Sequence, residues 1–183
     1  MSKHLYPRTD YKPEELEYLN SQATHKLWER ISYYIKYHNS TKLVDIGCST
    51  GYMNNFLTDY KYDYYGIDQS PYLIDAAVKK WHNTNIKFEF GNWNTSTTNV
   101  DCDCLLLLGV LPYGLPEYGY QENISPWDLY NRLIAKYNPT QIIIKETCKI
   151  QNGVEIDLET VDLEPFLEIA TNVEYINDVV PLQ

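Results

Sequence analysis

The stretch that decides the fold is Lys42-Leu-Val-Asp-Ile-Gly-Cys-Ser-Thr-Gly51, followed directly by Tyr52-Met-Asn-Asn-Phe-Leu57. Residues 43–46 are mostly apolar and β-branched, which is typical of a buried strand. The strand pattern breaks at Gly47, and apolar residues recur at helical spacing after Gly51. A strand, a glycine turn and a helix form the opening unit of a doubly wound α/β sheet. We expect both glycines, which carry no Cβ atom, to let the backbone approach a ligand.

A second strand is predicted over residues 62–68, and it ends in Asp68. A carboxylate at the end of the second strand, roughly 20 residues past the glycine turn, is typical of a group that binds ribose hydroxyls. The alternative is a helix cap, because Asp, Ser and Pro residues all suit the start of a helix near Pro71. Both interpretations remain open at this point.

The rest of the chain alternates between helical and strand patterns. Helices are predicted over residues 13–38 (with a weakening at Asn20–Ser21), 71–82, 127–137 and 162–170. Further strands are predicted over residues 85–90, 101–108, 141–146 and 173–180, with a small hairpin at 147–156. Strands that alternate with helices in this way indicate an α/β protein with a parallel sheet.

The stretch from Asp45 to Gly51 resembles motif I of the class I methyltransferases that use S-adenosylmethionine. That motif has an acidic residue followed by three glycines at alternate positions, and Ser49 stands here at the middle glycine. The resemblance covers roughly residues 40–147. It implies a Rossmann-like, doubly wound and mostly parallel sheet of strand order 3-2-1-4-5 plus a C-terminal strand, in three α/β/α layers. We expect one domain over residues 1–183, with a helical cap (1–40) and an α/β core (41–183).

The resemblance also implies which residues bind the cofactor S-adenosylmethionine. Asn92, after the third strand, matches the position that bonds the adenine amino group, and Trp93 either stacks on the purine or fills the core. The full set implied for cofactor binding is Asp45, Gly47, Cys48, Ser49, Gly51, Asp68, Gln69, Asn92, Trp93 and Gly109.

The methyl acceptor is predicted to be a small molecule, held by the long aromatic connection after the fourth strand. The candidate contacts there and at the end of the fifth strand are Tyr113, Glu117, Tyr118, Tyr120 and Glu146. Because the cofactor supplies the reactivity itself, no dedicated catalytic motif is required. Two alternatives are kept: a methyltransferase-like subunit or regulator that binds the cofactor without catalysis, and an RNA or DNA methyltransferase.

Other enzyme classes match the glycine turn less well. Gly47-Cys-Ser49-Thr-Gly51 has the spacing of a hydrolase nucleophile elbow, but no histidine follows His82 in the sequence. A phosphate-binding loop would need a lysine after its glycines, and a nicotinamide dehydrogenase would favour a Gly-x-Gly-x-x-Gly pattern.

Composition restricts partners and location. The formal net charge of -10 disfavours binding to nucleic acid phosphates. The four cysteines form no Cys-x-x-Cys pair, which predicts buried free thiols and no metal site. We expect a cytoplasmic protein, because the sequence shows neither a signal peptide nor an apolar run that would span a membrane. The sequence carries no signal for an oligomeric state.

Overall fold

A computed structural model of the chain describes residues 12–14, 22–91, 96, 98–108, 126–145, 149–151 and 154–156. The chain divides into two compact units, residues 1–146 and residues 147–183. In the second unit, β6 (Lys149–Gln151) and β7 (Val154–Ile156) pair antiparallel, which confirms the predicted hairpin. The predicted helix over 162–170 and C-terminal strand over 173–180 lie outside the described residues, and the single domain over 1–183 stays a prediction.

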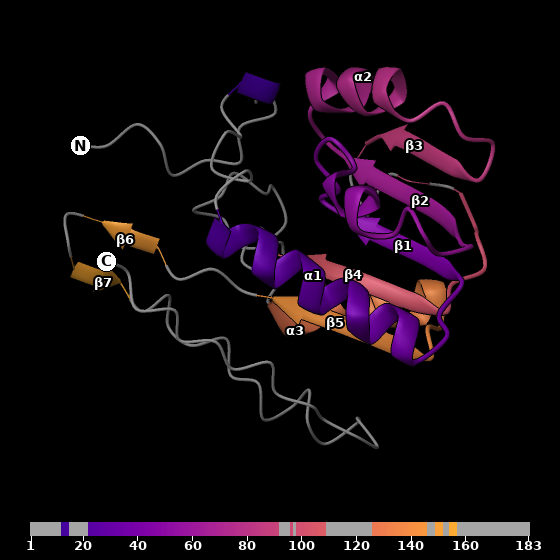
Figure 1. Cartoon of the computed structure of the whole chain (residues 1–183). Helices are drawn as coiled ribbons and strands as arrows, with labels where there is room; N and C mark the ends of the chain where they lie inside the picture. Colours follow the sequence, from indigo (N-terminus) through magenta and orange to yellow (C-terminus); the bar gives the residue numbers. More distant parts are fainter. Residues whose placement is uncertain are drawn as a thin grey trace. The chain divides into compact units, whose positions relative to one another are not determined.

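The first unit is built on a five-stranded sheet in which all neighbouring strands are parallel. The strands are β1 (Lys42–Ile46), β2 (Asp63–Asp68), β3 (Ile86–Phe90), β4 (Cys104–Leu108) and β5 (Gln141–Lys145). They lie in the order β3-β2-β1-β4-β5, which Figure 1 shows as adjacent arrows. The predicted Rossmann-like sheet and its strand order are confirmed. Because the order reverses at β1, the end of β1 is the switch point where such sheets bind ligands.

The α-helices described in this unit are α1 (Gln22–Tyr37), α2 (Pro71–Lys80) and α3 (Pro126–Tyr137), and the 3₁₀ helix η2 (Tyr52–Phe56) follows Gly51. The helical segment predicted after Gly51 is present, but it is a 3₁₀ helix and not an α-helix. The reason lies in two asparagines whose side-chain amides donate to carbonyls three residues back, Asn54 to Gly51 (2.9 Å) and Asn55 to Tyr52 (2.8 Å). Such local bonds compete with the α-helical pattern.

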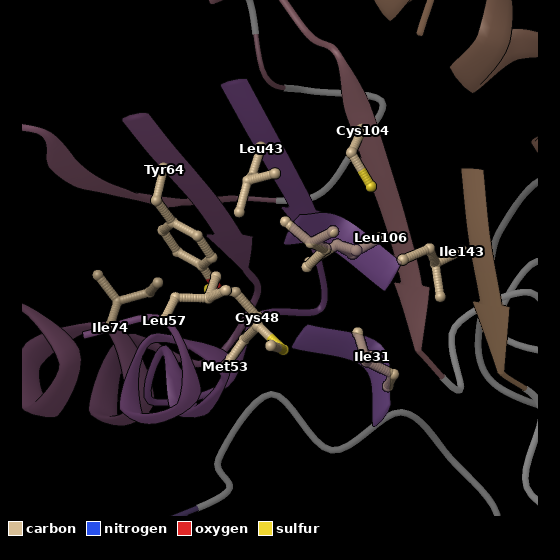
Figure 2. Close-up of a cluster of buried hydrophobic side chains, with 11 residues drawn as sticks. Ile31, Leu43, Cys48, Met53, Leu57, Tyr64, Ile74, Cys104, Leu106 and Ile143 are labelled. Atoms are coloured by element: carbon tan, nitrogen blue, oxygen red, sulfur yellow. The ribbon is translucent and has the colours of Figure 1, made fainter. Parts of the chain in front are cut away.

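The two faces of the sheet carry separate cores. Alternate strand residues on one face, among them Leu43, Tyr64 and Leu106, form a cluster with residues of α1, η2 and α2 (Figure 2). The intervening strand residues, such as Leu105 and Leu107, are also buried but point to the other face. Helix α3 contributes its own buried residues, so the first unit has the predicted three layers.

A polar cluster lies on the face of the sheet opposite Tyr64. Glu89 Oε2 accepts hydrogen bonds from the hydroxyl of Tyr65 and from those of Ser96 and Thr98, both at 3.0 Å. Lys136 of α3 donates to the carbonyl oxygen of Ser96 at 2.6 Å. Desolvation raises the pKa of Glu89, but the three hydroxyl donors and the charge of Lys136 outweigh it, so this pKa lies below its ordinary value.

Candidate ligand site at the ends of β1 and β2

The turn after β1 has an unusual backbone. Gly47, Ser49 and Gly51 all have positive φ angles, of 74°, 56° and 67°. Glycine adopts this left-handed region without strain, whereas a serine there needs support from its surroundings. We call residues 47–51 the glycine loop.

The glycine loop uses its own amides to bond protein acceptors. The N–H groups of Gly47 and Cys48 both donate to the carbonyl of Ile67, at 2.8 and 3.1 Å. The N–H of Ser49 donates to Asp68 Oδ2 at 2.8 Å, and that of Gly51 to the carbonyl of Cys48 at 2.9 Å. The loop is therefore preformed, and these four donors are not directed at a ligand.

Side chains anchor the loop from below. Cys48 is buried and packs on β2 at Gly66, where a Cβ atom would lie 2.7 Å from the Cys48 sulfur. The indole of Trp81 donates to the carbonyl of Thr50 at 3.1 Å. Gly66 was missed from the sequence, although a glycine inside a strand indicates a close approach of another group.

Gly51 has a packing role. A Cβ atom on it would lie 2.6 Å from the Phe88 ring and 3.0 Å from Trp81 Nε1. Protein side chains fill this space, which corrects the expectation that Gly51 exposes the backbone to a ligand. Gly47, by contrast, is exposed.

Asp68 connects the glycine loop to α2. Its Oδ2 accepts from the N–H of Ser49 and its Oδ1 from the N–H of Ser70, both at 2.8 Å. The residue that caps α2 is Ser70, whose hydroxyl accepts from the N–H of Leu73 at 3.3 Å. Burial raises the pKa of Asp68, and the backbone donors oppose that shift. Each carboxylate oxygen keeps a further lone pair for a ligand hydroxyl.

Asp45 is a second buried acid beside the loop. Its side chain is 3% exposed, and its Oδ2 accepts the Tyr64 hydroxyl at 2.5 Å. Burial raises the pKa of Asp45 to about 7, against the lowering effect of that hydrogen bond, and the charge of Asp68 raises it further. Burial likewise raises the pKa of the Cys48 thiol, which makes it unreactive.

Neither acid has a basic partner in the described part of the chain. The ion pairs described there join Lys36 to Asp59 and Lys42 to Asp101, on other parts of the surface. Buried carboxylates without a countercharge are costly, and a cation is the group that relieves that cost. The ends of β1 and β2 therefore favour a positively charged ligand.

The Ser49 hydroxyl and the Trp28 indole nitrogen are among the buried polar atoms that lack a hydrogen-bond partner within the described residues. Trp28 lies on α1 with its ring centroid 5.7 Å from that of Tyr52, directly after the loop. The Ser49 hydroxyl has no histidine partner among the described residues, so it is not part of a serine–histidine pair of the hydrolase type there. It is a free hydrogen-bonding group beside the uncompensated acids.

The structure brings together seven of the residues implied for cofactor binding, namely Asp45, Gly47, Cys48, Ser49, Gly51, Asp68 and Gln69. The remaining ones, and all candidate acceptor contacts, lie outside the described residues: Asn92, Trp93, Gly109, Tyr113, Glu117, Tyr118, Tyr120 and Glu146. Over the described ranges, no group of three or more His, Cys, Asp or Glu residues could hold a metal ion. No helix in those ranges is both long and apolar enough to pass through a membrane.

No protein-family model and no curated protein matches the sequence. Among solved structures, the plantazolicin methyltransferase BpumL with a triazolic desmethylPZN analog and SAH is 20% identical, with a TM-score of 0.52 over 67% of this chain and 47% of that chain. BpumL with a pentazolic analog and SAH is 22% identical, with a TM-score of 0.49 over 68% and 47%. The plantazolicin methyltransferase BamL is 21% identical, with a TM-score of 0.46 over 67% and 46%.

The match thus spans about half the length of these neighbours. At such identities, structural likeness is evidence for the fold and leaves function to be argued from the site. The first of these matches shows that this chain has the Rossmann-like α/β fold of BpumL.

Proposed function

We propose that this chain is a methyltransferase that binds S-adenosylmethionine at the ends of β1 and β2 and transfers its methyl group to a small molecule. The sheet order places the glycine loop at the switch point of the fold. The structural neighbour BpumL is a methyltransferase crystallised with SAH. The proposal extends that cofactor to this chain on the chemistry of the loop.

The observation that carries the proposal is the balance of donors and charges at the glycine loop. Four of its amides already bond protein acceptors, so they offer no nest for a phosphate. The helix that follows has only five residues, too few to present a strong dipole to an anion. Asp68, and Asp45 when it is ionised, add negative charge, although burial raises the pKa of both. A nucleoside that carries a cation and no phosphate suits this site better than a nicotinamide dinucleotide or ATP.

The residues present fit an adenosyl sulfonium. Asp68 has lone pairs left for the two ribose hydroxyls, and the Ser49 hydroxyl is free to bond a polar group of the ligand. When bound, the cofactor supplies an electrophilic methyl group. The work of the protein is then to orient the acceptor and to exclude water.

The proposed class of methyl acceptor rests on the amino-acid sequence. The net charge of -10 disfavours RNA and DNA acceptors, which supports a small molecule. We propose contacts to the acceptor from Tyr113, Glu117, Tyr118, Tyr120 and Glu146, and contacts to the adenine from Asn92, Trp93 and Gly109. A protein that binds the cofactor without catalysis is the competing proposal.

Calorimetry with the purified chain tests the cofactor. We expect S-adenosylmethionine and S-adenosylhomocysteine to bind, and NAD⁺ and ATP to bind more weakly or not at all. Asp68→Ala should weaken cofactor binding by roughly 1–3 kcal/mol, because ribose hydroxyls lose a buried acceptor. Asp75→Ala is the matched control, since Asp75 is an exposed acid on α2. Tighter binding of ATP or NAD⁺ would overturn the proposal.

Turnover separates an enzyme from a cofactor-binding subunit. The release of S-adenosylhomocysteine would be followed with fractionated small-molecule extracts and, in parallel, with RNA and DNA. We expect a small-molecule fraction to cause release of S-adenosylhomocysteine by the parent chain. Asp68→Ala should lose this release at a cofactor concentration that saturates the parent chain but not the variant. Binding of the cofactor without turnover on any acceptor would favour the binding subunit instead.

A further inference from the structure

The environment of Asp45 indicates how the site could distinguish S-adenosylmethionine from S-adenosylhomocysteine. This inference rests on the proposed function. Asp45 is 3% exposed at the centre of the sheet, where it is in register with Gly66 of β2 and Leu106 of β4. The Tyr64 hydroxyl, at 2.5 Å, is its one hydrogen-bond donor in the described part of the chain. Because a buried carboxylate with one hydrogen-bond donor is poorly stabilised in its ionised form, burial raises the pKa of Asp45 to about 7. Near neutral pH the protonated and ionised forms are therefore about equally stable.

The groups that surround Asp45 add no positive charge. Asp68 of β2 is a like charge, and the thiols of Cys48 in the loop and Cys104 of β4 are buried beside it. Tyrosines of other elements also pack against this core: Tyr34 of α1, Tyr60 and Tyr62.

Two basic groups on the helices that pack against this core have other partners. Lys80 of α2 donates to Asn55 Oδ1 at 2.9 Å, and His25 of α1 bonds the Tyr52 hydroxyl at 2.9 Å. Neither contributes to the interactions that act on Asp45. Among the described groups, an ionised Asp45 therefore has no countercharge, and a cation bound at the glycine loop would provide one.

We propose that Asp45 makes the site select the cofactor over its product, because a sulfonium at the glycine loop stabilises the ionised form of Asp45 and the neutral thioether sulfur of the product does not. In methyl transfer the S–CH₃ bond breaks with its electron pair left on sulfur, and a lone pair of the acceptor forms the new bond to carbon. The positive charge thereby passes to the acceptor, which loses it as a proton when it carries one. The product left at the loop is neutral, and Asp45 regains its proton from solvent.

The inference predicts a proton balance that differs between the two ligands. Binding of S-adenosylmethionine releases a proton from Asp45 at neutral pH, so its affinity rises as the pH rises through the pKa of that group. Binding of S-adenosylhomocysteine leaves the pKa of Asp45 unchanged, so its affinity does not respond to the ionisation of Asp45. The product is then held less tightly than the cofactor, and the difference grows with pH.

Calorimetry on the full chain measures both affinities and the protons exchanged, in two buffers of different ionisation enthalpy. Between about pH 6 and about pH 8 we expect affinity for S-adenosylmethionine to rise roughly tenfold, and that for S-adenosylhomocysteine to change less than about twofold. Asp45→Asn should remove the difference in pH response. The α-amino groups of both ligands also titrate and contribute to the pH dependence of their affinities. In Asp45→Asn only this contribution remains, so the variant measures it separately. Asp75→Asn, which neutralises the exposed acid on α2, is the matched control and should behave as the parent chain.

Tyr64→Phe provides a second, independent variant. It removes the donor to the ionised form of Asp45 and so should shift the pH response of S-adenosylmethionine binding to higher pH. Thermal unfolding of each variant verifies that it is folded. Parallel pH responses of the two ligands in the parent chain, or a response that survives in Asp45→Asn, would overturn the inference while the proposed function stands. If neither ligand binds the folded parent chain, the proposed function itself fails.

Discussion

Two neighbouring tyrosines of β2 show how one chemical pair is used in opposite ways on the two faces of the sheet. Tyr64 points to the face covered by α1 and η2 and donates to Asp45 of β1, whereas Tyr65 points to the other face and donates to Glu89 of β3. Asp45 is fully buried with one donor, and burial raises its pKa to about 7. Glu89 has three hydroxyl donors and partial access to water, and its pKa falls below its ordinary value.

The comparison teaches that a tyrosine–carboxylate bond does not by itself fix the charge of the acid. The charge depends on how deeply the acid is buried, on how many donors replace the lost water and on the charges nearby. On the Glu89 side those donors are complete, so the ionised form is stabilised and the cluster is structural. Asp45 has one donor within the described residues, so its ionised form is destabilised unless a cation lies nearby. A cationic ligand can therefore interact favourably with this acid.

Asp45→Asn should have the largest effect, and it should stabilise. The pKa of Asp45 is raised from 3.8 to about 7, so the neutral form stabilises the fold fully below pH 3.8, and this contribution is lost as the pH rises to about 7. Asparagine keeps the neutral form at every pH. We expect the free energy of unfolding to be about 3 kcal/mol higher than in the parent chain at about pH 8. Urea unfolding from about pH 5.5 upward checks this, and an advantage that does not grow with pH would contradict it.

Tyr64→Phe should destabilise by a somewhat smaller amount. It leaves the buried Asp45 oxygen without its donor, at a cost of roughly 2 kcal/mol at about pH 8, where the parent Asp45 is ionised. The cost should be smaller at about pH 5.5, where the carboxyl group is neutral. Urea unfolding of the variant at both pH values provides the measurement, with Asp45→Asn/Tyr64→Phe as the control in which the pH dependence disappears.

Glu89→Gln tests the other face with the same chemical change, and the sign should reverse. Because the pKa of Glu89 is lowered, its ionised form stabilises the fold above the unfolded value of 4.5, and this contribution is lost as the pH falls through the folded value. Glutamine removes it at every pH. We expect a loss of about 1 kcal/mol at about pH 7, moderated by solvent around the cluster. A stabilising Glu89→Gln in denaturant titrations would break the comparison.

Tyr65→Phe should have the smallest effect. Glu89 keeps the hydroxyl donors of Ser96 and Thr98 when the Tyr65 hydroxyl is removed. We therefore expect a loss of no more than about 0.5 kcal/mol at about pH 7, which shrinks as the pH falls through the pKa of Glu89, in the same unfolding experiments. A loss as large as that of Tyr64→Phe would show that the two pairs are equivalent after all.

The sequence allowed the sheet and its switch point to be predicted, because short runs such as Leu43–Ile46 and Cys104–Leu108 are too apolar to lie anywhere but in a buried parallel sheet. The position of Asp68 beside the glycine loop was predicted from its place at the end of the second strand, roughly 20 residues past the glycine turn. The sequence failed at η2, where Asn54 and Asn55 override an apolar pattern of helical spacing. It also could not show the roles of Gly66 and Gly51, since these depend on contacts with Cys48 and Phe88 from distant segments.

The bond from the Trp81 indole to the carbonyl of Thr50 has a practical consequence. Because this ring also lies against Gly51, any displacement of the turn alters the polarity around the fluorophore. A ligand that displaces the turn should therefore change the emission of Trp81, with Trp81→Phe as the background.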